Sequence, residues 1–174
     1  MKRFLNNEFW MLSVQGAFQR ANCYHKTASE KEKAAFRSAL KNFIDQHILP
    51  AYKVEVSEEQ HEHNILRIID FSRTSSSLFV ADALNVGISQ KLLNLYLKYH
   101  WCIGEIATPP HFPVDRIIQQ ELKMKPIEPW TRFKKIEEYR EVINHAKTLL
   151  EKEGLATLAE LELAYFNRRA TAAL

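Results

Sequence analysis

The chain has 174 residues, 46% of them hydrophobic and 26% charged, which is typical of one folded globular domain and excludes a disordered chain. Its four glycines are few for a β-sandwich or barrel, which needs many tight turns, so the composition predicts a single all-α domain over residues 1–174. The formal net charge of +3 permits contact with nucleic acid without requiring it.

Helix starts are marked along the chain by polar capping patterns. An opening helix is expected near residues 7–20. A Ser or Thr followed three residues later by Glu or Gln is typical of a capping box, and this pattern begins at Thr27, Ser57 and Thr157. Each is followed by apolar residues at helical spacing. A further amphipathic stripe runs from Phe133 to Leu150, and Gly154 is expected to cap its C-terminus.

The segments between the helices look like connectors. Residues 52–56 alternate like a strand but have no obvious partner, so an extended linker is expected there. Prolines mark two further connectors in the second half of the chain. Together the elements predict a compact domain of seven or eight helices.

Several features bear on the cellular setting. Cys23 and Cys102 lack the spacing of metal ligands and are expected to be reduced core thiols, as in a cytoplasmic protein. The N-terminus makes a poor signal peptide, and no apolar run approaches the length of a membrane span. We therefore expect an intracellular monomer of bacterial or phage association with no membrane contact.

Residues 82–118 contain the side chains best suited to catalysis or to binding a phosphate. A tight turn at Asn85–Gly87 is expected to lead into a helix that reaches about Ile103, on which Lys91, Asn94 and Lys98 share a polar stripe. A hairpin that feeds a helix N-terminus presents backbone amides to one point, which suits a phosphate.

This segment resembles the helix-hairpin-helix DNA glycosylase superfamily. The hairpin Gly-aliphatic-Gly-x-Lys of that superfamily corresponds to residues 87–91 (GISQK), and its apolar-Pro-Val-Asp element to residues 112–115 (FPVD). Asn94 also matches an asparagine found in several members. The resemblance implies a glycosylase-like helical fold, Lys91 as the nucleophile at the sugar C1′, and Asp115 as the carboxylate that assists base departure. It also implies that the hairpin contacts DNA through four residues: Gly87, Ser89, Gln90 and Asn94.

The sequence departs from the superfamily in three ways. Ser89 replaces the second glycine, the interval from Lys91 to Asp115 is a long 24 residues, and no cysteine quartet for an iron–sulfur cluster follows. The expected partner is duplex DNA with a flipped damaged or modified base, and no cofactor or metal is expected. Flanking aromatic and imidazole side chains are candidates for the base pocket: Tyr99, His100, Trp101 and His111.

Structural interpretations compete with these roles. Lys91 could be a solvated surface lysine, and Asp115 could simply be an N-cap. The pair His61 and His63 is expected on a solvated helix face, because positions two apart diverge too far to share a metal ion.

Two other functions stay open. Arg140 and His145 have the spacing of helical RNases of bacterial defence or toxin systems, but they lie about 140° apart around a straight helix, so a dimer would be needed to complete a site. The third possibility is a DNA-binding module that keeps the hairpin but has lost catalysis.

Overall fold

The computed structural model describes residues 1–166, and within them the fold is all-helical, as predicted. The described part holds seven α-helices and three short 3₁₀ helices, and its one β-type contact is an isolated bridge between Tyr24 and Phe79. The α-helices are α1 (Lys2–Phe18), α2 (Glu30–His47), α3 (Glu58–Arg73), α4 (Val86–Cys102), α5 (Arg116–Glu121), α6 (Ile136–Glu153) and α7 (Leu158–Tyr165). The 3₁₀ helices are η1 (Leu49–Lys53), η2 (Ser76–Leu78) and η3 (Trp130–Arg132).

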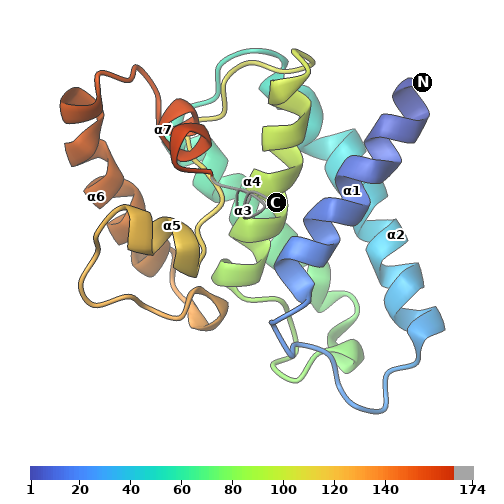
Figure 1. Ribbon diagram of the computed structural model, residues 1–174. Helices are drawn as coiled ribbons and strands as arrows, with labels where there is room; N and C mark the ends of the chain where they lie inside the picture. The colour runs from blue at the N-terminus through green and yellow to red at the C-terminus, as the bar shows by residue number, and fades with distance from the viewer. Residues whose placement is uncertain (167–174) are drawn as a thin grey trace, which may run out of the picture.

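Helix α4 is the central element of the fold (Figure 1). Helices α1 and α3 pack against it, α2 lies beyond them, and α5, α6 and α7 cover its other side (Figure 1). Residues 86–98 of α4 are buried without interruption, including the polar ones. A helix enclosed on all sides is normally apolar all round, so the polar side chains of α4 must find partners inside the molecule.

Side-chain caps fix the starts of five described helices: α2, α3, α4, α5 and α7. The capping box at Thr157 is present with its Glu160 partner. Ser57 caps α3, but Gln60 turns its side chain to Asn64 rather than back to the cap, so that box is half formed.

The expected cap at Thr27 is wrong by two residues. Ser29 caps α2 in a full box with Glu32, because Ala28 N donates to His25 O at 3.1 Å and places Thr27 inside a turn. The helix that follows buries Phe36, Leu40 and Ile44 along one face.

Two other local expectations need correction. The linker expected at residues 52–56 begins inside η1, where Pro50 stands in the first turn and Tyr52 is buried. Both cysteines are free thiols, but Cys102 is exposed at the end of α4 and is not a core residue. Among the described residues, no helix combines the length and the apolar character that a bilayer span requires.

Candidate active site

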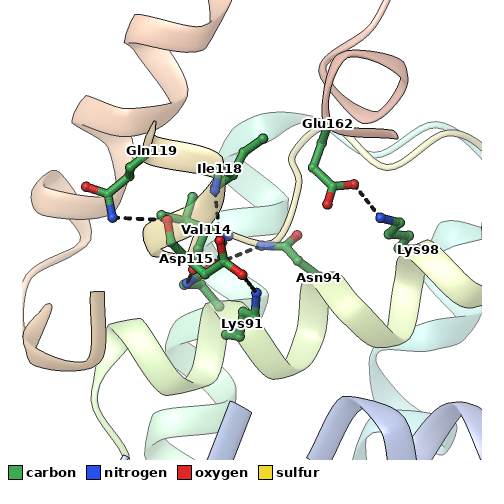
Figure 2. A network of polar contacts seen from close by, with 9 residues as sticks. Lys91, Asn94, Lys98, Val114, Asp115, Ile118, Gln119 and Glu162 are labelled. Atoms are coloured by element: carbon green, nitrogen blue, oxygen red, sulfur yellow. Dashed lines mark hydrogen bonds and ion pairs between the residues drawn. The ribbon is translucent and has the colours of Figure 1, made fainter. Parts of the chain in front are cut away.

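The fold brings Lys91 and Asp115 into contact. Lys91 stands in the second turn of α4, and Asp115 is the N-cap of α5, reached through the loop that follows α4. Lys91 Nζ lies 2.6 Å from Asp115 Oδ2, so a charge-assisted hydrogen bond joins them (Figure 2). The alternative that Lys91 is a solvated surface lysine is wrong, because its side chain is only 8% exposed.

Asp115 uses its two carboxylate oxygens for different partners. Oδ1 accepts the backbone N–H of Ile118 at 2.9 Å and caps α5, while Oδ2 faces Lys91. The N-cap interpretation is therefore confirmed, and it leaves the second oxygen available. A cap bond of this kind fixes the rotamer of the side chain and so aims Oδ2 at the amine.

Two buried glutamines hold the chain on either side of Asp115. Gln90 Nε2 donates to Val114 O at 2.8 Å, and Gln90 Oε1 accepts from Val114 N at 3.0 Å. Gln119 Nε2 donates to Asp115 O at 3.2 Å and also bonds the backbone of Glu128. The Val114–Asp115 peptide is thus fixed to α4 on one side and to the following loop on the other.

The Lys91–Asp115 pair lines a surface cleft of about 250 Å³. The cleft runs along α4 from Lys91 to Tyr99, and its other lining residues come from α1 and the residues just after it, from α5 and from η3. Its remaining lining comes from four elements: Leu12, Gly16, Gln19, Arg20, Leu95, Tyr99, Arg116, Ile117 and Trp130. Trp130 was missed by the sequence analysis, and Lys91 Nζ lies 5.8 Å from its ring centroid, within cation–π range.

A second buried ion pair continues the polar stripe of α4. Lys98 Nζ contacts Glu162 Oε2 of α7 at 2.6 Å, and both side chains are almost fully buried (Figure 2). Burial raises the pKa of the Glu162 carboxyl, although the Lys98 ammonium opposes that shift. A small cavity of about 60 Å³ borders Lys91, Asp115 and Glu162 beneath α7. Sequence spacing gave no indication of Glu162, since it lies 64 residues from Lys98.

The residues predicted to contact DNA through the hairpin do not reach the surface. Gly87, Ser89, Gln90 and Asn94 are all buried within α4. Asn94 Nδ2 donates to Tyr139 Oη at 2.9 Å inside the core. In this fold these four residues present almost no surface that DNA could reach, so their contacts do not support the predicted DNA-binding hairpin.

The cause is that the expected tight turn is already helix. Asn85 is the N-cap of α4, and its side chain accepts from Ile88 N. Gly87 N donates to Phe133 O at 3.1 Å, so neither amide is open to a phosphate. Gly87 has no positive φ; a Cβ there would lie 1.7 Å from Trp130 O, so the glycine permits close approach of η3 rather than of DNA.

Most of the residues expected to form the base pocket lie outside the Lys91–Asp115 cleft. His100 is nine residues after Lys91, which places it about 180° around α4. It bonds Glu105 through Nδ1 and packs against Phe9 and Tyr96. Neither His100, Trp101 nor His111 lines the Lys91–Asp115 cleft, whereas Tyr99 does.

His111 belongs to a buried polar cluster with side chains of α3, α4 and α6. The centroid of its ring lies 4.8 Å from the ring centroid of His61 and 5.5 Å from the ring centroid of Tyr139. Burial lowers the pKa of His111 to about 3 and also lowers the pKa of His61, so both rings are neutral at physiological pH. The expectation that His61 lies on a solvated face is wrong, because this side chain is fully buried while His63 is exposed. No group of side chains suited to a metal ion occurs in the described part of the chain.

Arg140 and His145 have structural partners of their own. Arg140 forms a two-pronged contact with Glu62, at 3.0 and 2.5 Å. His145 Nε2 donates to Leu122 O at 2.9 Å. Both side chains thus tie α6 to neighbouring segments, which leaves the RNase hypothesis without a geometric argument.

Comparisons of the chain with protein families, curated proteins and solved structures found no match. The chemistry of the Lys91–Asp115 cleft is therefore the basis on which a function is inferred.

Proposed function

We propose that this protein is a DNA glycosylase that excises a damaged or modified base and nicks the strand through a lysine Schiff base. The observation that supports it best is the 2.6 Å contact between Lys91 Nζ and Asp115 Oδ2 at the wall of an open cleft. An amine and a carboxylate at hydrogen-bond distance are what attack on a sugar C1′ requires: one group forms the bond, and the other moves the proton.

The carboxylate prepares the amine for attack. Asp115 Oδ2 accepts a proton from the Lys91 ammonium, which leaves a lone pair on Nζ. The bond between C1′ and the base then breaks, and its electron pair leaves with the base. As the proton held by Asp115 passes to the departing base, the carboxylate regains its negative charge and stabilises the positive charge that develops on the sugar.

The covalent step follows from the same two groups. The Nζ lone pair forms a bond to C1′, and the proton held by Asp115 passes to the departing base. Opening of the sugar ring breaks the bond between C1′ and the ring oxygen; a proton passes from Nζ to that oxygen, which becomes a hydroxyl, and a protonated imine remains. The ionised Asp115 then accepts a proton from C2′, and the electron pair of that C–H bond expels the 3′ phosphate and cuts the strand.

The partly closed setting of Lys91 favours such a nucleophile. Its side chain is nearly buried, its contact with Asp115 fixes the position of Nζ, and the apolar side chains of Trp130 and Leu95 line the cleft beside it. A fixed amine needs little reorganisation to reach a sugar placed in the cleft.

The test uses a duplex with an abasic site, because the aldehyde of that site reacts with any competent lysine whatever base the enzyme prefers. The Lys91 amine and the aldehyde form an imine with loss of water, and borohydride reduces this imine to a stable amine. We expect a covalent protein–DNA adduct for the wild type and none for Lys91→Gln.

The matched control is Lys147→Gln, which removes a lysine that pairs with Glu58 outside the cleft. It should form the adduct as the wild type does. Undiminished trapping in Lys91→Gln would assign the reaction to another amine. No trapping in any variant would favour a DNA-binding module without catalysis or remove DNA as the partner.

A further inference from the structure

Two arginines stand on opposite sides of the Lys91–Asp115 cleft. Arg20 follows the end of α1, and Arg116 is the first residue of α5. Both are exposed, and both line the cleft. In Figure 1, α1 and α5 lie on opposite sides of α4, and the two arginines belong to the segments where α1 ends and α5 begins.

Neither arginine is neutralised by a neighbour in the described part of the chain. Arg73 and Arg140, by contrast, pair with Asp70 and Glu62. Among the described residues that line the cleft, Asp115 is the one acid, and Lys91 already pairs with it. The cleft therefore carries a net positive charge at its rim, which attracts an anion.

The interior of the cleft has a different character from its rim. Its walls include Leu12, Leu95, Ile117 and Trp130, which offer apolar surface to a flat ring. A nucleotide combines such a group with anionic oxygens on either side of its sugar. The guanidinium fork of arginine matches the oxygens of a phosphate.

We infer that Arg20 and Arg116 bind the two DNA backbone phosphates that flank the nucleotide whose sugar reaches Lys91. This inference rests on the proposed glycosylase function. It also replaces the hairpin as the DNA contact, because the amides of Gly87 and Ile88 are engaged by Phe133 O and the Asn85 side chain. Entry of the strand is then along the groove between α1 and α5.

The test measures equilibrium affinity for a duplex with a non-reactive abasic analogue. The wild type is compared with the double variant Arg20→Gln/Arg116→Gln between roughly 50 and 200 mM salt. Loss of two phosphate contacts should weaken binding about tenfold or more and reduce the salt slope by about 2. The control Lys53→Gln/Lys152→Gln removes the same charge from two exposed lysines outside the cleft and should change both quantities far less.

The outcomes separate this inference from the proposed function. Wild-type affinity and slope in the arginine variant, or an equal loss in the lysine control, would overturn the phosphate contacts even if Lys91 forms the covalent adduct. Arginine-dependent binding without any adduct would support the contacts and contradict the glycosylase. At saturating protein, the arginine variant should still form the adduct.

Discussion

At the scale of single residues, Asp115 has two roles: it caps α5, and it is the carboxylate of the proposed active site. Its Oδ1 caps the helix and its Oδ2 meets Lys91. Asparagine keeps an oxygen that accepts the cap bond but carries no charge. We expect Asp115→Asn to lower abasic-site trapping about 100-fold or more, because the proton acceptor is lost.

The same variant should remain folded but less stable. The nearly buried Lys91 ammonium would lose its carboxylate, which should cost about 1–3 kcal/mol in the free energy of unfolding. Glu162→Gln is the matched control, since it removes the carboxylate of the second buried pair at a comparable cost. Trapping that fell equally in both variants would reduce Asp115 to a structural residue.

His111 gives the stability of the fold a dependence on pH. Burial lowers its pKa to about 3, whereas an unfolded histidine titrates near about 6.5. Between these values the unfolded chain binds a proton that the native chain does not, so the free energy of unfolding falls as pH falls. His111→Phe should reduce this slope by up to about 1.4 kcal/mol per pH unit. Denaturant titrations from neutral to mildly acid pH measure it, and equal slopes in both proteins would contradict the buried neutral ring.

At the scale of elements, the junction between α4 and η3 depends on the absence of one side chain. A Cβ on Gly87 would lie 1.7 Å from the carbonyl oxygen of Trp130, which is backbone and cannot turn aside. Gly87→Ala should therefore lower the free energy of unfolding by about 3 kcal/mol or more.

Gly16→Ala is the control for Gly87→Ala, because its new Cβ meets only the end of the Leu95 side chain, and alanine favours a helix. Chemical denaturation of both variants measures the difference. Equal stabilities would mean that η3 is not held against α4 by this contact.

Local sequence patterns predicted the helices better than their surroundings. Caps and apolar spacing placed α2, α3, α6 and α7 within a few residues, since both act over one or two turns. The interior position of α4 was missed because Lys91, Asn94 and Lys98 look like a solvated stripe. Their partners lie 24, 45 and 64 residues away in the chain, beyond the reach of helical periodicity.

The candidate site could be predicted only in part from the sequence, again because local patterns do not reveal contacts between residues far apart in the chain. The motif resemblance singled out Lys91 and Asp115, and the fold joins them. It also assigned Gly87 to phosphate contact, a role that depends on whether the helix start is open. No local pattern reveals that η3, more than 40 residues later, covers this start.

At the scale of the whole molecule, the cleft exists because α1 and α5 stand apart over α4. Leu12 lines its α1 wall and is partly exposed, so a larger side chain there should fill the cleft without disturbing the core. We expect Leu12→Trp to lower the trapping rate about tenfold or more at unchanged melting temperature, because loss of correct positioning alone costs this much. Met11→Trp adds the same bulk at a neighbouring exposed position outside the cleft, and its trapping rate should stay at the wild-type level. Equal rates in all three proteins would mean that the sugar does not enter here.

The central claim is that the Lys91 amine forms the bond to the sugar. Its most direct test is to reduce the wild-type adduct on abasic DNA, digest the protein, and locate the modified residue by peptide mass spectrometry. We predict that the added sugar mass lies on Lys91. Its location on Lys98, on the N-terminal amine or on any other lysine would contradict the proposed role of the Lys91–Asp115 pair.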